Sequence, residues 1–298
     1  MNHSLVSVII PSYKQRGLLN NAIQSALSQT YPFIEVIVVD DNQPQSKERL
    51  ETEAIMTAFN NDHRVKYIQH PVNKNGAAAR NTGIKAANGQ YIAFLDDDDE
   101  WKSEKIKIQL DYLESHKHFS GVYTYRLIDG KKDPNYPYEG NAIVPFLMLR
   151  ASMQTSTLLF RKEVLEDIGG FDESFRRHQD YELLVKFFLK GYTIGCVPKY
   201  LTEMHSVGGN RLSGIQLNEL KAKFLNTFDK DLRELDKKKH GLRNKIIVAN
   251  YVEVMDSHLA AGNMKLVYKI IKDYFLMSPF TFISQSCFMF MNHIKRKL

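Results

Sequence analysis

Four short apolar runs alternate with helical patterns in the first 95 residues, and this alternation constrains the fold more than any other feature of the chain. The runs are rich in β-branched residues, whereas between them apolar residues recur at a helical spacing. Strands joined by crossover helices form a parallel sheet, and continuously apolar strands are covered on both faces. The sequence therefore predicts an α/β fold with strands at 6–10, 36–39, 65–68 and 91–95.

Polar residues follow three of these strands, at 11–13, 40–41 and 96–99. Ligands of open α/β sheets bind at the carboxyl ends of the strands, so these residues are expected to share one site. The run Asp96 to Asp99 is the most constraining, because adjacent carboxylates repel one another unless a cation is present. Mg²⁺ and Mn²⁺ are oxygen-seeking ions that bridge carboxylates to phosphates. The alternative is an acidic, solvated turn or a helix cap.

Other sequence features narrow the class of partner. The chain has neither a Gly-x-Gly-x-x-Gly after the first strand nor a Walker A loop, so a bound phosphate would need a metal in place of a glycine-rich cradle. A net charge of +6 favours anionic partners, but no basic and aromatic groove pattern supports nucleic acid. Cys196 and Cys287 lie far apart without metal or redox spacing, which indicates a reducing compartment.

Four segments resemble the family 2 glycosyltransferases. They are Val-Ser-Val-Ile-Ile-Pro-Ser-Tyr at 6–13, Val-Val-Asp-Asp at 38–41, Asn-Gly-Ala-Ala-Ala-Arg-Asn-Thr-Gly at 75–83 and Phe-Leu-Asp-Asp-Asp-Asp at 94–99. The resemblance covers about residues 4–215 in the family's order and spacing. It implies a GT-A fold, with a mostly parallel Rossmann-like sheet flanked by helices, and a metal-dependent, inverting enzyme. The implied reaction moves a hexosyl unit from a nucleotide sugar, a UDP-sugar, to an acceptor hydroxyl, with Mn²⁺ or Mg²⁺.

The resemblance also assigns the donor-binding residues. Tyr13 and the backbone of Pro11 would hold the uracil ring, and Asp41 would accept its N3–H, with Asp40 able to exchange roles with Asp41. Arg80 would lie near the base or the phosphates. The competing interpretations are an ordinary aromatic residue at a strand end for Tyr13 and a surface arginine on a small-residue helix for Arg80.

The four aspartates leave the register of the family's Asp-x-Asp motif open. We predict that Asp98 binds the metal and that Asp96 or Asp97 binds the ribose hydroxyls, whereas Asp99 caps the following helix. The segment 204–213 resembles the family's closing loop, in which His205 would complete the metal shell. An isolated histidine is otherwise a structural residue.

A second motif supplies the predicted catalytic base. Residues 179–188 have one apolar helical face, and Asp180 lies in the first turn. The helix dipole favours an anion there, so Asp180 could be a plain helix-end charge. The resemblance instead makes Asp180 the base, although Gln179 stands where many members have Glu. Glu182 is the runner-up. Residues 154–160 are predicted to form another strand.

From residue 216 to residue 298 the resemblance gives little, and we expect a helical region that follows a GT-A domain at 1–215. Residues 275–291 are rich in Phe and Met and are followed by a basic end. This pattern fits a helix at an anionic membrane surface, and it also fits a helix packed on the catalytic domain. The chain shows neither a secretory signal nor a long apolar span, so we expect a cytoplasmic protein, peripheral at the inner face of the cytoplasmic membrane.

The resemblance therefore predicts an enzyme of bacterial surface polysaccharide, lipopolysaccharide or capsule assembly that acts on a saccharide or lipid-linked saccharide. A sugar nucleotidyltransferase is one alternative, but such enzymes carry a glycine- and lysine-rich loop that 11–17 does not supply. A non-catalytic nucleotide-binding module is the other alternative, although such a module would be expected to have lost Asp98 or Asp180.

Overall fold

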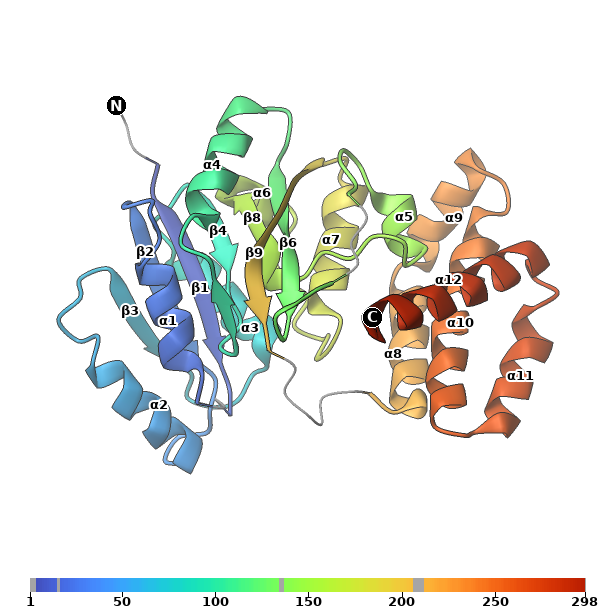
Figure 1. Cartoon of the computed structure of the whole chain (residues 1–298), viewed down its shortest axis with the longest axis horizontal. Helices are drawn as coiled ribbons and strands as arrows, with labels where there is room; N and C mark the ends of the chain where they lie inside the picture. The colour runs from blue at the N-terminus through green and yellow to red at the C-terminus, as the bar shows by residue number, and fades with distance from the viewer. Residues whose placement is uncertain (1–3, 15–16, 134–136, 206–211, 298) are drawn as a thin grey trace. The chain divides into compact units, whose positions relative to one another are not determined.

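The computed structural model describes residues 4–14, 17–133, 137–205 and 212–297. The chain divides into two compact units, Met1–Ala142 with Met153–Ser206, and Ile143–Ser152 with Val207–Leu298. The first unit contains the sheet and its helices, and the second is helical (Figure 1). The short helix α5, Ile143–Leu147, groups with the second unit, although it precedes the boundary expected near residue 215.

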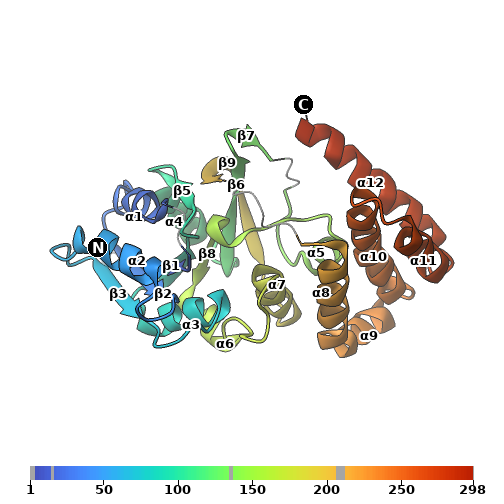
Figure 2. The same cartoon turned by 90° about the horizontal axis from the view of Figure 1, so that it is seen from below.

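The first half of the sheet is parallel, as the alternation of strands and helices predicted. Its order is β3-β2-β1-β4, and each neighbouring pair is parallel. Helix α1 and helix α3 lie on opposite faces of this sheet, as Figure 2 shows, because the chain reverses direction across the sheet after β3. The elements are β1 (Val6–Ser12), α1 (Leu19–Leu27), β2 (Ile34–Asp40), α2 (Lys47–Thr57), β3 (Val65–Gln69), α3 (Gly76–Ala86) and β4 (Tyr91–Phe94).

The second half of the sheet is mixed, with the order β4-β8-β6-β9-β5. Strand β8 is antiparallel to both β4 and β6, β6 is parallel to β9, and β7 pairs with β6. The short strand β5 pairs antiparallel with β9, which brings the end of the acidic run next to the end of β9. The elements are β5 (Asp99–Trp101), α4 (Lys105–Ser115), β6 (Gly121–Ile128), β7 (Lys131–Lys132), β8 (Leu158–Arg161), α6 (Lys162–Asp167), α7 (Gln179–Leu189) and β9 (Ile194–Met204).

Two local predictions were wrong. The strand predicted at 154–160 begins at Leu158, because Thr155–Thr157 form a 3₁₀ turn. Asp99 does not cap a helix: it begins β5, and α4 starts six residues later after Glu104 without a side-chain cap. Both errors arise from tertiary contacts, since Ser156 of the 3₁₀ turn donates a hydrogen bond to the buried carboxylate of Asp99.

The main core lies between the sheet and the helices α1 and α4. Alternate residues of β1 point to this side, since successive side chains of a strand face opposite ways. Val8 and Ile10 therefore pack in one cluster with Ala22 and Ile23 of α1 and Leu110 of α4. Strands β1 and β2 are covered on both faces, because α3 packs on them from the other side. Strand β3, at the edge of the sheet, is only partly buried, so the expectation of cover on both faces was wrong for this strand. This layering fixes the carboxyl ends of β1, β2 and β4 at one edge of the sheet.

Helix α3 approaches β1 closely because residue 83 is glycine. A Cβ atom at Gly83 would lie 2.3 Å from Cγ2 of Ile9. We expect Gly83→Ala to lower the free energy of unfolding by about 1–3 kcal/mol through overpacking, although alanine is the better helix former. Chemical denaturation would measure the loss, with Lys85→Ala on the exposed side of α3 as the control. An equally or more stable Gly83→Ala protein would contradict this account of the packing.

The second unit is built around α10, as the contacts of its helices show. Helices α8, α11 and α12 each pack against α10, through clusters that include Val254 and Val252. Helix α8 starts at a capping box, in which Ser213 and Gln216 bond each other's backbone N–H groups. No helix among the described residues combines the length and the apolar character needed to cross a bilayer. The helices are α8 (Gly214–Thr227), α9 (Asp229–Lys238), α10 (Leu242–Ala260), α11 (Met264–Tyr274) and α12 (Pro279–Lys297).

Candidate active site

The acidic run forms a loop between β4 and β5 that neighbouring elements hold in place. The backbone N–H of Tyr13, at the end of β1, donates to the Asp97 carboxylate at 3.2 Å. The Ser156 hydroxyl donates to Asp99 at 2.5 Å and accepts from the backbone N–H of Asp96 at 3.1 Å. The structure therefore brings the end of β1 and the acidic run together at one edge of the sheet, as predicted from the strand ends.

Burial, and after it mutual repulsion, disfavours the charged form of the carboxylates in this loop. Desolvation, followed by the negative charges of Asp98 and Asp96, raises the pKa of Asp97 to about 7. Burial, followed by the charge of Asp96, also raises the pKa of Asp99 well above its usual range. A divalent cation would relieve this repulsion.

The acidic loop offers part of a coordination shell. Among the described residues, no group of three or more His, Cys, Asp or Glu side chains is arranged to hold a metal ion. Protein sites for Mg²⁺ commonly use one or two carboxylates, and substrate phosphates and waters fill the remaining positions. The residues present therefore fit a metal that binds together with a diphosphate.

His205 lies at this loop, immediately after β9. The register of β5 and β9 pairs Asp99 with Met204, so Asp98 and His205 are the next residues along the two strands. In the structure the His205 ring lies 3.3 Å from Glu100, through Nε2 and Oε1. The rest of the segment that resembles a closing loop, residues 206–211, lies outside the described residues.

Arg80 connects the acidic loop to the helix of the predicted base. Its guanidinium forms an ion pair with Asp96 and donates a hydrogen bond to the Gln179 side chain at 2.7 Å. Arg80 is only 8% exposed and its guanidinium also lies over the ring of Phe171, so the side chain is held in one position. Gly76 makes room for this bridge, because a Cβ there would lie 3.0 Å from Nη1 of Arg80.

Helix α3 is tied to the loop that precedes α7, and these bonds fix Arg80 relative to Gln179. Asn81 bonds both the backbone carbonyl and the backbone N–H of Phe171, each at 2.9 Å. Asn75 caps α3 by accepting from the backbone N–H groups of its first turn, and its amide donates to the carbonyl of Glu173. Helix α3 is thus connected to the loop that leads into α7.

Asp180 lies in the first turn of α7, directly after the bridge. His178 has a left-handed backbone, with φ of 57°, and turns the chain into the helix. Desolvation raises the pKa of Asp180. A hydrogen bond from the backbone N–H of Tyr181 and the positive charge of Arg80 partly oppose that shift. Asp96 raises this pKa further, so the acidic loop, Arg80 and Asp180 act on one another electrostatically.

Glu182, the runner-up for the base, is engaged elsewhere. Its side chain is 2% exposed, pairs with Lys186 at 2.9 Å and accepts from the backbone N–H of Asp172 at 3.0 Å. Two residues along a helix point in different directions, and Glu182 points to the turn before α7. The contacts therefore give Glu182 a structural role.

The two aspartates after β2 differ in their surroundings. Asp40 is buried, pairs with Arg49 at 3.0 Å and accepts from the Tyr67 hydroxyl at 2.6 Å. Asp41 is bonded at both carboxylate oxygens by His70 and by the segment 73–75, whose donors lie 2.7–2.8 Å away. A direct bond from a uracil N3–H to Asp41 would displace one of these donors.

The ring of Tyr13 is open to a ligand. It is 47% exposed, and Lys14 Nζ lies 5.2 Å from its centroid. Pro11 is a partly exposed residue near the end of β1, opposite Val39 of β2. Tyr13 borders the acidic loop, because its backbone N–H bonds Asp97.

Sequence reasoning missed two residues of the site. Ser156 fixes both ends of the acidic loop, and Gln179 holds Arg80. A signal existed only for Gln179, as a departure from the resembled motif, whereas nothing in the spacing of 154–160 indicated that Ser156 reaches the acidic loop.

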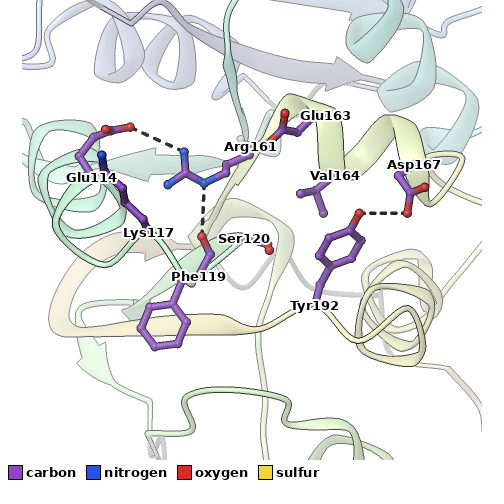
Figure 3. Close-up of a pocket in the computed structure, with 9 residues that line it drawn as sticks. All are labelled: Glu114, Lys117, Phe119, Ser120, Arg161, Glu163, Val164, Asp167 and Tyr192. Atoms are coloured by element: carbon purple, nitrogen blue, oxygen red, sulfur yellow. Dashed lines mark hydrogen bonds and ion pairs between the residues drawn. The ribbon is translucent and has the colours of Figure 1, made fainter.

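A separate hollow of about 640 Å³ lies at the other end of the sheet (Figure 3). Arg161 lines it from the end of β8 and pairs with the first residue of β4, Tyr91, whereas the acidic loop follows the last residue of β4. Arg161 is bound to Glu114 and to the Phe119 carbonyl, and Tyr192 donates to Asp167. The hollow is thus distinct from the candidate site.

Comparison with known proteins identifies the family. The sequence model described as Glycosyl transferase family 2 matches residues 7–169, which is more than half of the chain. This chain belongs to glycosyl transferase family 2. The family 2 match includes the ends of β1, β2 and β4 and the whole of α3, but it ends before Asp180 and His205.

Curated family 2 relatives carry glycosyltransferase names. A Rickettsia prowazekii protein named as an uncharacterized glycosyltransferase is 36% identical over 62% of this chain and 58% of its own length. The amylovoran biosynthesis glycosyltransferase AmsB of Erwinia amylovora is 30% identical over 67% of this chain and 69% of its own length. The first four relatives, all from Rickettsia, are matched over only 32–58% of their own length.

Solved structures show the same fold. S. aureus TarS 1-349 in complex with UDP-GlcNAc superposes with a TM-score of 0.62 at 20% identity, over 86% of this chain and 73% of that chain. The similarity at this identity concerns the fold alone. It confirms the predicted family 2 architecture, in which a curled α/β sheet is flanked by helices and followed by a helical C-terminal region.

Proposed function

We propose that this protein is an inverting glycosyltransferase that moves a hexosyl unit from a UDP-sugar to an acceptor hydroxyl. The observation that carries the proposal is the Arg80 bridge, which joins Asp96 of the acidic loop to Gln179, the residue before Asp180. A donor site and a base are thereby held in one rigid arrangement. The UDP-GlcNAc complex of TarS, a protein of the same fold, supports a nucleotide sugar as the donor.

The donor-side residues would divide the nucleotide between them. The exposed Tyr13 ring stacks on the uracil beside the Pro11 backbone, and Asp41 shapes the base pocket through the segment that it bonds. Asp96 or Asp97 would bind the ribose hydroxyls, and Arg80, which pairs with Asp96, would lie near the base or the phosphates. Asp98, with His205 beside it, would hold Mn²⁺ or Mg²⁺, which supplies Lewis-acid stabilisation of the leaving diphosphate.

Asp180 would remove the proton from the acceptor hydroxyl. An inverting transfer is a single displacement, so the hydroxyl must lose its proton on the side opposite the leaving diphosphate. A raised pKa suits this task, because a more basic carboxylate accepts a proton more readily. The positive charge of Arg80 favours the ionised form of Asp180 and so limits the rise of its pKa.

The raised pKa predicts the pH dependence of transfer. Asp180 must be ionised to act as a base, so kcat should fall as the pH drops through its raised pKa, above the ordinary value of 3.8. Because the Arg80 charge lowers this pKa, Arg80→Met should move the acidic limb of the profile to higher pH. The profiles would be measured with saturating donor and metal, and Lys85→Met on the exposed side of α3 is the control. A limb that does not move would contradict the assignment.

We also propose that the acceptor is a saccharide or lipid-linked saccharide of a bacterial surface polysaccharide, lipopolysaccharide or capsule. Support comes from the relatives, which include AmsB and the putative teichuronic acid biosynthesis glycosyltransferase TuaG of Bacillus subtilis, 28% identical over 70% of this chain. An enzyme with such an acceptor would work at the inner face of the cytoplasmic membrane.

A donor screen tests the proposed function. Purified protein with Mn²⁺ is incubated with a panel of nucleotide sugars, and the released nucleotide is measured. Release of UDP from one UDP-sugar is the expected result. Release of pyrophosphate from a nucleoside triphosphate and a sugar phosphate would support a nucleotidyltransferase instead, and binding of a nucleotide sugar without turnover in the presence of diverse acceptors would support a non-catalytic module.

A further inference from the structure

Exposed apolar side chains are concentrated in one short part of the second unit. Of the fifteen large hydrophobic residues that are exposed among the described residues, nine lie between 264 and 291. Leu276 and Phe280 are 81% and 85% exposed, which is unusual for side chains of this size. Clustered exposure of this kind indicates a contact surface.

Helix α11 arranges its exposed residues in two adjacent rows. Met264, Tyr268 and Ile271 are spaced by four and three residues, so they lie along one side of the helix. Val267 and Ile270, which flank this row on the helix, are buried. Each exposed apolar residue is followed by an exposed lysine, which places a basic row beside the apolar row. The lysines are Lys265, Lys269 and Lys272.

Helix α12 also has an inner and an outer apolar side. Phe282 is buried in the cluster with Val248 and Val252 of α10, and Gln285 is fully buried. Phe280 and Ile283 are exposed on the outer side, together with Cys287 and Phe290 at the same helical spacing. Helix α12 therefore packs on α10 of its own unit and still presents an apolar side.

Charge decides which partner fits these surfaces. Residues 264–298 contain six Lys and Arg against one Asp. The cores of protein–protein interfaces are depleted in lysine, whereas helices that lie in a membrane surface combine an apolar face with flanking basic residues. Lysine stems can lie along apolar surface while their ammonium groups reach anionic headgroups.

We propose that α11, the turn 275–278 and the outer side of α12 form a membrane-contact face that lies on an anionic bilayer. The face is defined by Met264, Tyr268, Ile271, Leu276, Met277, Phe280 and Ile283 with the three lysines of α11. The purpose of this face depends on the proposed function, because membrane contact would bring the enzyme to a lipid-linked acceptor. Binding itself depends only on the face and on the anionic lipid.

Vesicle co-sedimentation of the full chain tests the proposal. The wild type should bind phosphatidylcholine vesicles that contain phosphatidylglycerol far more tightly than vesicles of phosphatidylcholine alone, and added salt should weaken binding. Replacing Lys265, Lys269 and Lys272 by Gln together should weaken binding about a hundredfold, since each basic residue near an anionic surface contributes about fivefold. Leu276→Ser with Phe280→Ser should weaken it at least about tenfold.

Matched controls distinguish an effect of this face from a general effect of lost positive charge or lost exposed apolar surface. Lys237, Lys238 and Lys239 are exposed on and just after α9, and their replacement by Gln changes the net charge of the same unit equally. Leu50→Ser with Val72→Ser removes two exposed apolar residues of the first unit. Both controls should bind vesicles much as the wild type does. Because the substituted side chains are exposed, thermal unfolding of all variants should match the wild type.

Three outcomes would overturn the proposal. In the first, the wild type binds vesicles equally well with and without phosphatidylglycerol. In the second, the variants of the face bind vesicles as tightly as the wild type does. In the third, the wild type is a dimer in the absence of lipid, and Leu276→Ser with Phe280→Ser converts it to a monomer. The last would mean that a second copy of the chain covers the face. Release of UDP from a UDP-sugar, measured without vesicles, should be the same in all variants. Its absence in the wild type would count against the proposed function and leave the vesicle result unaffected.

Discussion

Asp180→Asn should bind the donor and metal as the wild type does and transfer sugar at least about a hundredfold more slowly, because general-base catalysis contributes about 10²–10⁴-fold. The amide has nearly the shape of the carboxylate but cannot accept the proton of the acceptor hydroxyl. Calorimetry would measure donor affinity, and product formation would measure transfer.

Glu182→Gln is the matched comparison for Asp180→Asn. Glu182 pairs with Lys186 and accepts from the backbone of Asp172, so its substitution should lower thermal stability while most of the transfer rate remains. Normal transfer by Asp180→Asn together with lost transfer by a stably folded Glu182→Gln would make Glu182 the base. Normal transfer by both variants would contradict a single displacement that is assisted by either carboxylate.

Asp98→Asn should lower turnover by at least about a hundredfold, because Lewis-acid stabilisation of a leaving group is worth several kcal/mol. Mn²⁺ binding in the presence of UDP should weaken in parallel, as calorimetry would measure, and a chelator should silence the wild-type enzyme. Asp111→Asn is the control, since Asp111 is a largely exposed residue of α4 that pairs with Lys107. Full activity of the wild type in excess chelator would contradict a metal-assisted reaction.

The sequence predicted those parts of the fold that local patterns determine. The β-branched runs and the intervening helical spacing predicted β1 to β4 and their parallel pairing, because each helix crosses over the sheet. Strands β1, β2 and β4 bury both faces as expected, whereas β3 is only partly buried. The apolar face of α7 likewise follows from its helical period, which placed Asp180 in the first turn. The strand-end rule then predicted correctly that the end of β1 and the acidic run meet at one edge.

The features that the sequence did not predict depend on pairing between residues far apart in the chain. The antiparallel return of β8 and the insertion of β5 beside β9 depend on contacts between residues far apart in the chain, for which 154–160 and Asp99 carry no local signal. The Arg80 bridge to Gln179 joins residues 99 positions apart. Asp41 shows the same limit within the site, because its place after β2 was evident whereas its bonds to His70 and the segment 73–75 were not.

The anomeric configuration of the released sugar is the most direct test of the central claim, an inverting transfer from a UDP-sugar with Asp180 as the base. Proton NMR would follow hydrolysis of the preferred donor at times shorter than mutarotation, with Asp180→Asn as the control. From an α-linked UDP-sugar the account predicts that the wild type first releases the β-anomer and that Asp180→Asn releases it at least about a hundredfold more slowly. Initial release of the α-anomer would contradict the account, since it would require a retaining mechanism.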